Sequence, residues 1–284
     1  MRKICVYHAA CPDGFGAAWA TWKAWEGEGE FVARGHYDRM RGSRVEDALV
    51  LFVDIAPGLD EIRQLAEHAA RVVVLDHHVT NQKAFAKDPE LLRALEDDGH
   101  EIHFDMAHSG SVLAWQHLFP GQPVPDILRY VQDQDIWTWE LPKSAEVNAA
   151  LSSYDQDFET WSRLADRDIS ELALEGEPIV RTDRVEVARA IKNPSPVTLG
   201  KLRVEAINAR TRRSAIGHAL AERQSFGNQW GCVYRLEGSK VQATLYSIGD
   251  FDVSKIAGEY GGGGHKNAAG FSVPLEKWLG EMLA

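Results

Sequence analysis

Short apolar runs that alternate with helical stretches are the feature that most limits the fold of this chain. Residues 3–7 (KICVY), 49–53 (LVLFV) and 72–75 (VVVL) have the composition of buried strands. Between them, the pattern predicts one helix over residues 17–25 and an amphipathic helix over residues 58–70. Continuous apolar strands separated by helices predict a parallel sheet that is covered on both faces.

Each of these strands ends in polar side chains that are able to bind a metal. His8 ends the first strand, Asp54 follows the second, and Asp76-His77-His78 follows the third. In open parallel sheets, ligands bind at the carboxyl ends of the strands. The sequence therefore predicts that these side chains share one site at that edge of the sheet.

The rest of the chain predicts a helical region followed by a second domain. Residues 126–191 are mostly helical in pattern, and Pro194 and Pro196 then prevent a helix from continuing. Residues 231–236 and 241–246 have the pattern of a β-hairpin. We therefore predict an α/β fold with a parallel-sheet domain over residues 1–192, a linker over 193–200, and a smaller α+β domain over 201–284.

Composition narrows the class of protein. The chain has 284 residues, of which 44% are hydrophobic and 26% charged, and this balance is typical of folded domains. Its net charge of -11 argues against binding double-stranded DNA through a positive field. No apolar run is long enough to span a membrane, and the first residues lack a signal peptide. Three scattered cysteines favour a reducing cytoplasm over a disulfide framework.

The segment from His8 to Gly14 places a carboxylate close to the first strand end. Pro12 and Gly14 favour a tight turn that brings Asp13 back towards His8. An imidazole with one or two carboxylates is a common site for a divalent metal. The other interpretation is that Asp13 caps the helix that follows. Spacing alone supports the two interpretations equally.

Asp76-His77-His78 is the strongest single motif. Neighbouring side chains on an extended segment point to opposite faces, so regular strand geometry does not let both histidines bind one ion. One division assigns His77 to a metal and His78 to a substrate phosphate. The alternative is that surface histidines occur here by chance, and His8 and Asp54 on the neighbouring strand ends disfavour it.

A further pair of acids, Asp133 and Asp135, lies near an apolar helical stretch. Acids in such positions are usually solvated. Trp137 and Trp139, however, indicate a buried or cleft-lining position, where an unpaired carboxylate is costly and a metal would neutralise it. Most of the nine tryptophans are expected in the core, and stacking of one of them on a base stays open.

A glycine run, Gly261 to Gly264, precedes His265 and Lys266 in the predicted second domain. Glycines let backbone N–H groups converge on an anion, and the two cationic side chains would add donors. A flexible linker is the alternative. The remaining histidines show no partners in the sequence and are expected to be structural or solvated: His36, His68, His100, His103, His117 and His218.

These motifs resemble those of the DHH phosphoesterases. Asp76-His77-His78 resembles the signature of that family, residues 8–14 its first motif, Asp54 its second, and the Asp133 region its fourth. Residues 261–270 resemble the glycine-rich motif of the DHH-associated C-terminal domain. Within the family, the chain most resembles bacterial members related to short-oligoribonucleotide and cyclic-nucleotide phosphodiesterases.

The resemblance implies a catalytic first domain with a metal pair, usually manganese, and an active site in the cleft between the two domains. It implies that Asp54 bridges the two ions. Carried over by motif, the implied metal ligands are His8, Asp13, Asp54, His77 and Asp133.

The resemblance also implies roles for the side chains around the metals. Asp76 would ligate a metal or orient His77, as carboxylates beside metal ligands often do. His78 would contact the scissile phosphate and protonate the leaving oxygen. Gly264 and His265 would hold the substrate phosphate from the other side.

One position departs from the family pattern. Many members carry a second aspartate two residues after the first in the first motif, and here that position is Phe15. The second metal thereby loses a carboxylate. Either Asp135 or Asp76 replaces it, or the second ion is weakly held.

The expected activity is hydrolysis of short oligonucleotides or of small cyclic or linear nucleotides by metal-activated water. Imidazole ligands shift the preference from Mg²⁺ towards Mn²⁺, Co²⁺ or Zn²⁺, and one or two ions are expected. A phosphomonoesterase or pyrophosphatase on the same metals is one alternative, and a nucleotide-binding regulator without turnover is another. The expected partner is a small nucleotide or a short single-stranded oligonucleotide. Binding to double-stranded DNA or to a membrane is not expected. Whether the chain forms a homodimer stays open.

Overall fold

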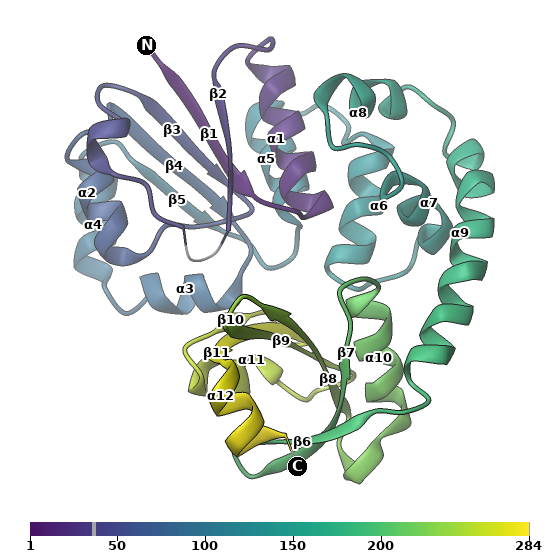
Figure 1. Ribbon diagram of the computed structural model, residues 1–284. Helices are drawn as coiled ribbons and strands as arrows, with labels where there is room; N and C mark the ends of the chain where they lie inside the picture. The colour runs from purple at the N-terminus through teal and green to yellow at the C-terminus, as the bar shows by residue number, and fades with distance from the viewer. Residues whose placement is uncertain (36–37, 284) are drawn as a thin grey trace. The chain divides into compact units, whose positions relative to one another are not determined.

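The computed structural model describes residues 1–35 and 38–283, so His36 lies outside the described residues. The chain divides into two compact units, Met1–Val180 and Arg181–Ala284, which are drawn in Figure 1 and treated separately below. Among the described residues, no helix is both long and apolar enough to cross a membrane.

The first unit contains a five-stranded, fully parallel sheet, which confirms the predicted α/β class. Its strand order is β2-β1-β3-β4-β5. The two edge strands were not predicted, because edge strands are half exposed and do not form continuous apolar runs. The strands are β1 (Lys3–His8), β2 (Glu30–Arg34), β3 (Leu49–Val53), β4 (Arg71–Asp76) and β5 (Glu101–Phe104).

Helices cover both faces of this sheet (Figure 1). Side chains alternate between the faces along each strand, so that Cys5 and Leu51 belong to one core while Ile4 and Val50 belong to the other. The first core includes α1 (Pro12–Ala24) and α5 (Gly110–Leu118). The second includes α2 (Leu59–Ala66), α3 (Val79–Phe85) and α4 (Pro89–Asp97).

A set of helices follows the sheet in the chain, as predicted for residues 126–191. Leu128 and Trp161 from these helices extend the core that α1 shares with the sheet. The boundary between the two units falls inside the last helix, between Val180 and Arg181. The helices are α6 (Asp126–Asp135), α7 (Ser144–Leu151), α8 (Phe158–Ala165) and α9 (Ile169–Ala190).

The second unit is built on a mixed sheet with the order β10-β11-β9-β8-β7-β6. Strands β7 and β8 pair in parallel, and the other neighbours pair antiparallel, including the predicted β8–β9 hairpin. The strands are β6 (Ser195–Leu199), β7 (Leu202–Asn208), β8 (Trp230–Glu237), β9 (Lys240–Ser247), β10 (Gly263–Gly264) and β11 (Ala268–Pro274). The helices of this unit are α10 (Arg213–Arg223), α11 (Val253–Glu259) and α12 (Leu275–Lys277). Its short helical turns are η2 (Ser225–Gly227) and η3 (Trp278–Met282), and the first unit contains one further turn, η1 (Gly42–Arg44).

The segment predicted as a linker, residues 193–200, forms a strand instead. Ser195–Leu199 is β6, which pairs antiparallel with β7 at the edge of the second sheet. Pro196 lies inside this strand, and an edge strand tolerates a proline because its outer side is joined, among the described residues, only by an isolated bridge from Val197 to Leu283. The prolines therefore mark an edge strand and not an unstructured connection.

Candidate metal centre

Three of the expected side chains meet where the strand order of the parallel sheet reverses, between β1 and β3. Sheets with the order 2-1-3-4-5 bind ligands at this point, beyond the carboxyl ends of the strands. Asp54 lies 3.2 Å from His8 through Oδ2 and Nδ1, and 3.0 Å from His77 through Oδ1 and Nε2. The Asp54 carboxylate therefore lies between two imidazoles that come from different strands.

The backbone holds Asp54 in an unusual conformation. Its φ angle is 57°, in the left-handed region that non-glycine residues rarely adopt, and its N–H donates to the carbonyl of Leu75 at 2.9 Å. Gly110 packs directly against it, because a Cβ at Gly110 would lie 2.4 Å from the Cβ of Asp54. The sequence alone does not indicate this contact, which only a glycine allows.

Asp13 does not cap the helix in which it lies. Helix α1 begins at Pro12, earlier than predicted, since a proline is well placed in a first turn while Gly14 and Gly16 weaken the helical pattern. The Asp13 carboxylate instead accepts from the N–H groups of Gly110 at 2.6 Å and Ser111 at 3.1 Å, at the start of α5. This brings its Oδ2 to 3.7 Å from Nε2 of His77.

The structure places Asp135, and not Asp133, beside His77. Oδ2 of Asp135 lies 3.4 Å from Nε2 of His77. The carboxylate of Asp133 is buried elsewhere: Oδ1 accepts from the Thr138 hydroxyl at 2.7 Å and from the Glu140 N–H at 2.8 Å. In this geometry the oxygens of Asp133 accept hydrogen bonds from the loop after α6, and its assignment as a ligand stays a prediction.

The side chains form two groups of three that meet at Asp54. In each group, nitrogen or carboxylate oxygen atoms that are able to bind a metal lie within 4.8 Å of one another. Asp54 connects the groups, since one of its oxygens contacts His77 and the other contacts His8. The first group is Asp13, His77 and Asp135, and the second is His8, Asp54 and His78.

The carboxylate of Asp76 contacts the ring of His78. Its Oδ1 lies 2.6 Å from Nδ1 of His78 and also accepts the backbone N–H of His77 at 2.9 Å. Its Oδ2 accepts from the amide of Asn81 at 2.7 Å. Asp76 is fully buried, so these contacts fix its carboxylate and, through it, the His78 ring. The role expected for Asp76 towards His77 stays a prediction.

Phe15 belongs to the hydrophobic core. It occupies the position at which the family pattern described above has a second aspartate. Its ring stacks on Phe158 at 5.3 Å and meets Trp161 edge-on at 5.1 Å. Its side chain is 3% exposed. A carboxylate in this apolar environment would be costly. The further carboxylate beside His77 in this structure is that of Asp135, on another helix.

Buried charges shift the pKa values of the centre in opposite directions. Burial and the neighbouring Asp13 raise the pKa of Asp135 to about 8. For His77, burial lowers the pKa, but the hydrogen bond to Asp54 and the nearby carboxylates outweigh it and raise the value to about 10. Burial likewise opposes the ionised form of Asp54, yet the contacts with His77 and His8 hold its pKa well below the ordinary range.

The donors of this centre fit a divalent cation. Oδ2 of Asp135 is a buried oxygen without a hydrogen-bond partner among the described residues, and such an atom is costly to leave unsatisfied. Several carboxylates also crowd around His77, and their mutual repulsion raises the pKa of Asp13 in addition to burial. A cation between these oxygens would give that oxygen a ligand and remove the repulsion.

The predicted phosphate-binding residues lie in the second unit, in a tight hairpin. Gly263 and Gly264 form β10, which pairs with β11, and the N–H of His265 donates to the carbonyl of Ala268 at 2.8 Å. A Cβ at Gly264 would lie 2.6 Å from that same carbonyl oxygen, and its φ angle is 139°. The glycine run is therefore not a flexible linker, since close packing against β11 requires it.

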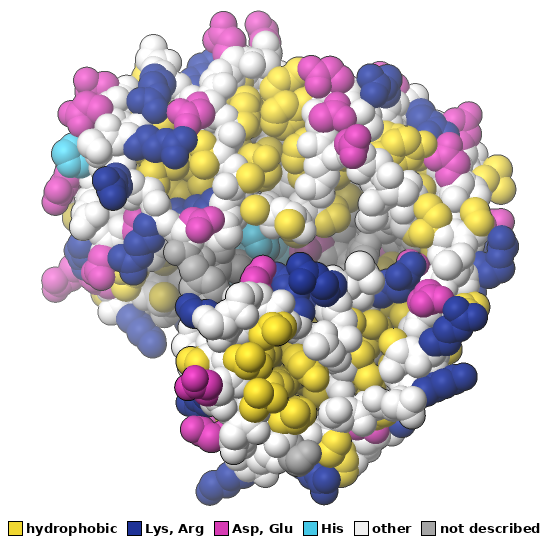
Figure 2. All heavy atoms as spheres, in the orientation of Figure 1, with side chains coloured by type: hydrophobic (Ala, Val, Ile, Leu, Met, Phe, Trp, Pro, Cys, Tyr) yellow, Lys and Arg dark blue, Asp and Glu magenta, His cyan; other side chains and the backbone are white. Residues whose placement is uncertain are grey.

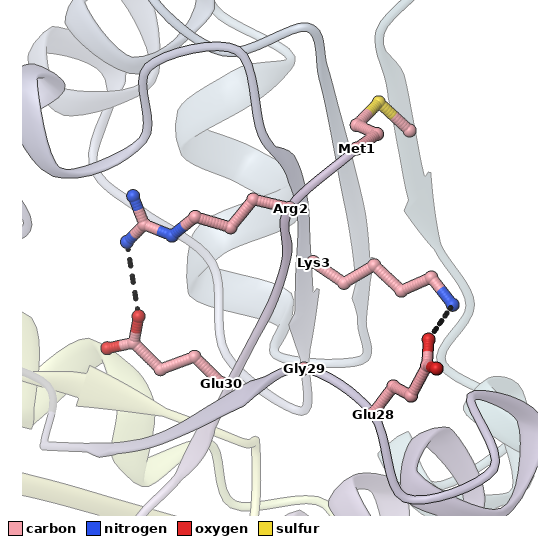
Figure 3. A pocket seen from close by; sticks show the side chains of 6 residues that line it. All are labelled: Met1, Arg2, Lys3, Glu28, Gly29 and Glu30. Atoms are coloured by element: carbon pink, nitrogen blue, oxygen red, sulfur yellow. Dashed lines mark hydrogen bonds and ion pairs between the residues drawn. The ribbon is translucent and has the colours of Figure 1, made fainter.

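A surface pocket of the first unit lies at the other end of β1 from His8 (Figure 3). Arg2 and Glu30 pair across it at 3.1 Å, and Lys3 and Glu28 at 3.6 Å. Both carboxylates of the pocket are thus already neutralised by cations on an exposed surface. The pocket lies between the start of β1 and the segment that leads into β2. The candidate metal-binding side chains do not line it.

Comparison with known proteins agrees with the resemblance. Residues 200–284 match the DHHA1 domain family. Uncharacterized protein R106 of Acanthamoeba polyphaga mimivirus is 26% identical over 303 residues, which are 96% of this chain and 70% of that protein. Oligoribonuclease NrnB of Bacillus subtilis is 22% identical over 258 residues, which are 84% of this chain and 62% of that protein.

Solved structures share the fold. An exopolyphosphatase-related protein from Bacteroides fragilis superposes with a TM-score of 0.51 at 14% identity, covering 95% of this chain and 86% of that one. RecJ from Thermus thermophilus, solved with Mn²⁺, has a TM-score of 0.51 at 15% identity and covers 98% of this chain and 50% of that one. Residues 200–284 thus match the DHHA1 domain family, and with its strand-end motifs and parallel sheet the chain is similar to the DHH phosphoesterases.

Proposed function

We propose that this chain is a metal-dependent phosphodiesterase that hydrolyses short oligonucleotides or small cyclic or linear nucleotides. The observation that carries the proposal is the convergence of Asp13, Asp54, His77 and Asp135, with a buried oxygen of Asp135 that has no hydrogen-bond partner among the described residues. The name of the NrnB relative, an oligoribonuclease, supports this substrate class.

The proposed metal ligands are the residues expected from the sequence, with one replacement. Asp135 would take the place of Asp133, and Asp54 would offer one oxygen to each group because its two oxygens face different imidazoles. Imidazole donors favour Mn²⁺, Co²⁺ or Zn²⁺ over Mg²⁺. The bound cations would supply neutralisation of the phosphate charge and activation of a water molecule. The proposed ligand set is His8, Asp13, Asp54, His77 and Asp135.

His78 is proposed to contact the scissile phosphate and to protonate the leaving oxygen. The 2.6 Å contact between Asp76 and Nδ1 places the ring proton of His78 on that nitrogen and sets the orientation of the imidazole. Burial lowers the pKa of His78, but Asp76 outweighs it and raises the pKa, which keeps a proton available for the leaving group. Gly264 and His265 are proposed to bind the substrate phosphate from the second unit.

The charge distribution supports a small substrate. The net charge is -11, and on the face drawn in Figure 2 acidic side chains are interspersed with Lys and Arg side chains. A duplex would need an extended positive surface. A cytoplasmic location is also proposed, since the three cysteines form no disulfide: Cys5, Cys11 and Cys232.

The test is hydrolysis of a panel by the wild type and by Asp54→Asn. The panel contains pApA, a cyclic dinucleotide, a 5-mer RNA, 3′-phosphoadenosine 5′-phosphate and pyrophosphate, each with Mn²⁺ or Mg²⁺ and product analysis. We expect phosphodiester cleavage with Mn²⁺, and a loss in Asp54→Asn of more than about a hundredfold, because a bridging ligand should matter more than an outer partner of a ligand. Turnover retained in Asp54→Asn would refute the proposal.

Asp105→Asn is the matched control for this test. Asp105 is an exposed carboxylate that pairs with His108 at 2.8 Å and belongs to neither group of the centre. Its replacement should leave activity unchanged. Cleavage restricted to 3′-phosphoadenosine 5′-phosphate or pyrophosphate would instead identify a monoesterase or pyrophosphatase on the same residues.

A further inference from the structure

Two tryptophans lie directly after the candidate metal centre in the chain. Helix α6 ends at Asp135, and Trp137 and Trp139 follow it. Two residues of chain span at most about 7 Å between Cα atoms, so the backbone of Trp137 is held close to that of Asp135. The Trp137 side chain is 37% exposed, whereas Trp19 and Trp161 of the same unit are almost completely buried.

The rings of the pair are held edge to face. Their centroids are 4.9 Å apart, and their planes are inclined at 85°. This arrangement is favourable for aromatic rings, and Trp137 stays partly exposed within it. The pair thus combines mutual support with an exposed aromatic side chain, which stacking on a planar ligand needs.

The backbone of both tryptophans is in the left-handed region. Trp137 has a φ angle of 63° and Trp139 one of 53°. The position after a helix end commonly adopts this conformation, but glycine usually occupies it because a side chain is disfavoured there. Strained positions of this kind cluster at ligand-binding sites and persist where the surroundings hold them.

Hydrogen bonds to Asp133 hold the loop that contains Trp137 and Trp139. Its backbone carbonyl accepts from the N–H of Thr138 at 3.0 Å and of Trp139 at 3.2 Å. Its carboxylate accepts from the Thr138 hydroxyl and from the N–H groups of Glu140 and Leu141. The side chain of Asp133 is 4% exposed, so these bonds are shielded from water. One buried acid therefore fixes the loop that carries both tryptophans.

We propose that Trp137 and Trp139 form a stacking site for a nucleobase of the substrate, with Asp133 as a positioning residue. This inference rests on the proposed function, and it adds that the enzyme selects substrates that carry a base. Every nucleobase has a flat π-surface, so stacking gives affinity with little preference among bases. The site would therefore favour nucleotides over pyrophosphate and over sugar phosphates, whichever base they carry.

The experiment compares pApA with two analogues in which one nucleoside or the other has an abasic ribose. Wild type, Trp137→Ala and Trp137→Phe are assayed with Mn²⁺, and kcat and KM are determined separately. We expect Trp137→Ala to raise KM for pApA by about tenfold to a hundredfold with little change in kcat. It should cause no further loss on the analogue that lacks the stacked base, and Trp137→Phe should keep part of the affinity.

Phe226→Ala is the matched control. Phe226 is also an exposed aromatic residue with a positive φ angle of 59°, but it lies in the second unit and packs against the guanidinium of Arg203. Its replacement should leave KM for pApA unchanged. An equal loss on pApA and on both abasic analogues in Trp137→Ala, or no loss on pApA, would overturn the stacking site.

Failure of the proposed function is distinguished by a binding measurement. If the wild type cleaves no phosphodiester with any metal, calorimetric titration with pApA and the abasic analogues measures stacking alone. A preference for pApA that disappears in Trp137→Ala would support the stacking site while the phosphodiesterase assignment fails. Equal affinity for pApA and the analogues in the wild type would refute the stacking site.

Discussion

Asp133 and Asp135 show how far a displacement of two residues along one helix changes the surroundings of a side chain. Successive residues of an α-helix are rotated by about 100°, so residues two apart point in nearly opposite directions. Asp135 faces His77, and Asp133 faces the loop that contains Thr138. The two acids also differ in their pKa shifts. Burial raises the pKa of Asp135 to about 8. For Asp133, the hydrogen bonds from Ser144 and Thr138 outweigh burial and lower the pKa.

The two acids should therefore respond differently to the same substitution. Asp135→Asn should weaken Mn²⁺ binding by more than about tenfold, because it removes the charge of a proposed ligand. Asp133→Asn should leave Mn²⁺ affinity nearly unchanged and raise KM for pApA, because the loop that carries the tryptophans loses its anchor. Calorimetric Mn²⁺ titration and separate kcat and KM values test this. Equal loss of Mn²⁺ affinity in both variants would contradict it.

At the scale of elements, the parallel strands bring the polar groups together, and neighbouring loops support the strands. Strand β4 carries Asp76 at its end, and near its start the N–H of Val72 donates to Nδ1 of His100 at 3.0 Å. His100 accepts this bond only when Nδ1 is unprotonated. Burial lowers the pKa of His100 below its ordinary value, which agrees with a neutral ring in the folded protein.

This bond predicts a loss of stability in mild acid. A histidine whose pKa is lower in the folded state binds protons more readily when unfolded, so its contribution is complete above the unfolded pKa of about 6.5 and decreases as the pH falls below it. Urea unfolding at pH 7.5 and 5.5 should show this decrease. His100→Asn keeps an acceptor but does not titrate, and it should show a smaller decrease. An equal pH dependence in the two proteins would refute this role of His100.

At the scale of the whole molecule, the first unit holds several buried carboxylates near one another, and a native-state ligand should stabilise it. Burial and Asp54 both raise the pKa of Asp13, so the acids oppose one another when no cation is present. A cation that binds the folded state alone adds about 2.7 kcal/mol at a concentration one hundred times its Kd. For a unit of this size, such a gain corresponds to about 5 to 10 °C in Tm.

Scanning calorimetry of the full chain tests this expectation. After treatment with EDTA, added Mn²⁺ should raise the Tm of the wild type by that amount, and further EDTA should reverse the rise. Asp54→Asn should show little shift, since it lacks the negative carboxylate that contacts a histidine of each group. An unchanged Tm in the wild type at millimolar Mn²⁺ would exclude a metal centre of useful affinity.

The sequence by itself determined the parallel strands and the polar residues at their ends. Those features follow from local patterns, since β1, β3 and β4 are continuous apolar runs and parallel strands align their carboxyl ends. It therefore predicted that His8, Asp54 and His77 would lie together, and their contacts of 3.2 and 3.0 Å agree.

Only the tertiary structure decided which groups complete the centre. The bonds from Gly110 and Ser111 to Asp13 join residues almost one hundred positions apart, and no local pattern encodes them. Which of Asp133 and Asp135 lies beside His77 depends on the rotation of α6, because the sequence pattern does not distinguish the two acids. Contacts between elements are set by packing in three dimensions, and packing selects among side chains that the sequence leaves equivalent.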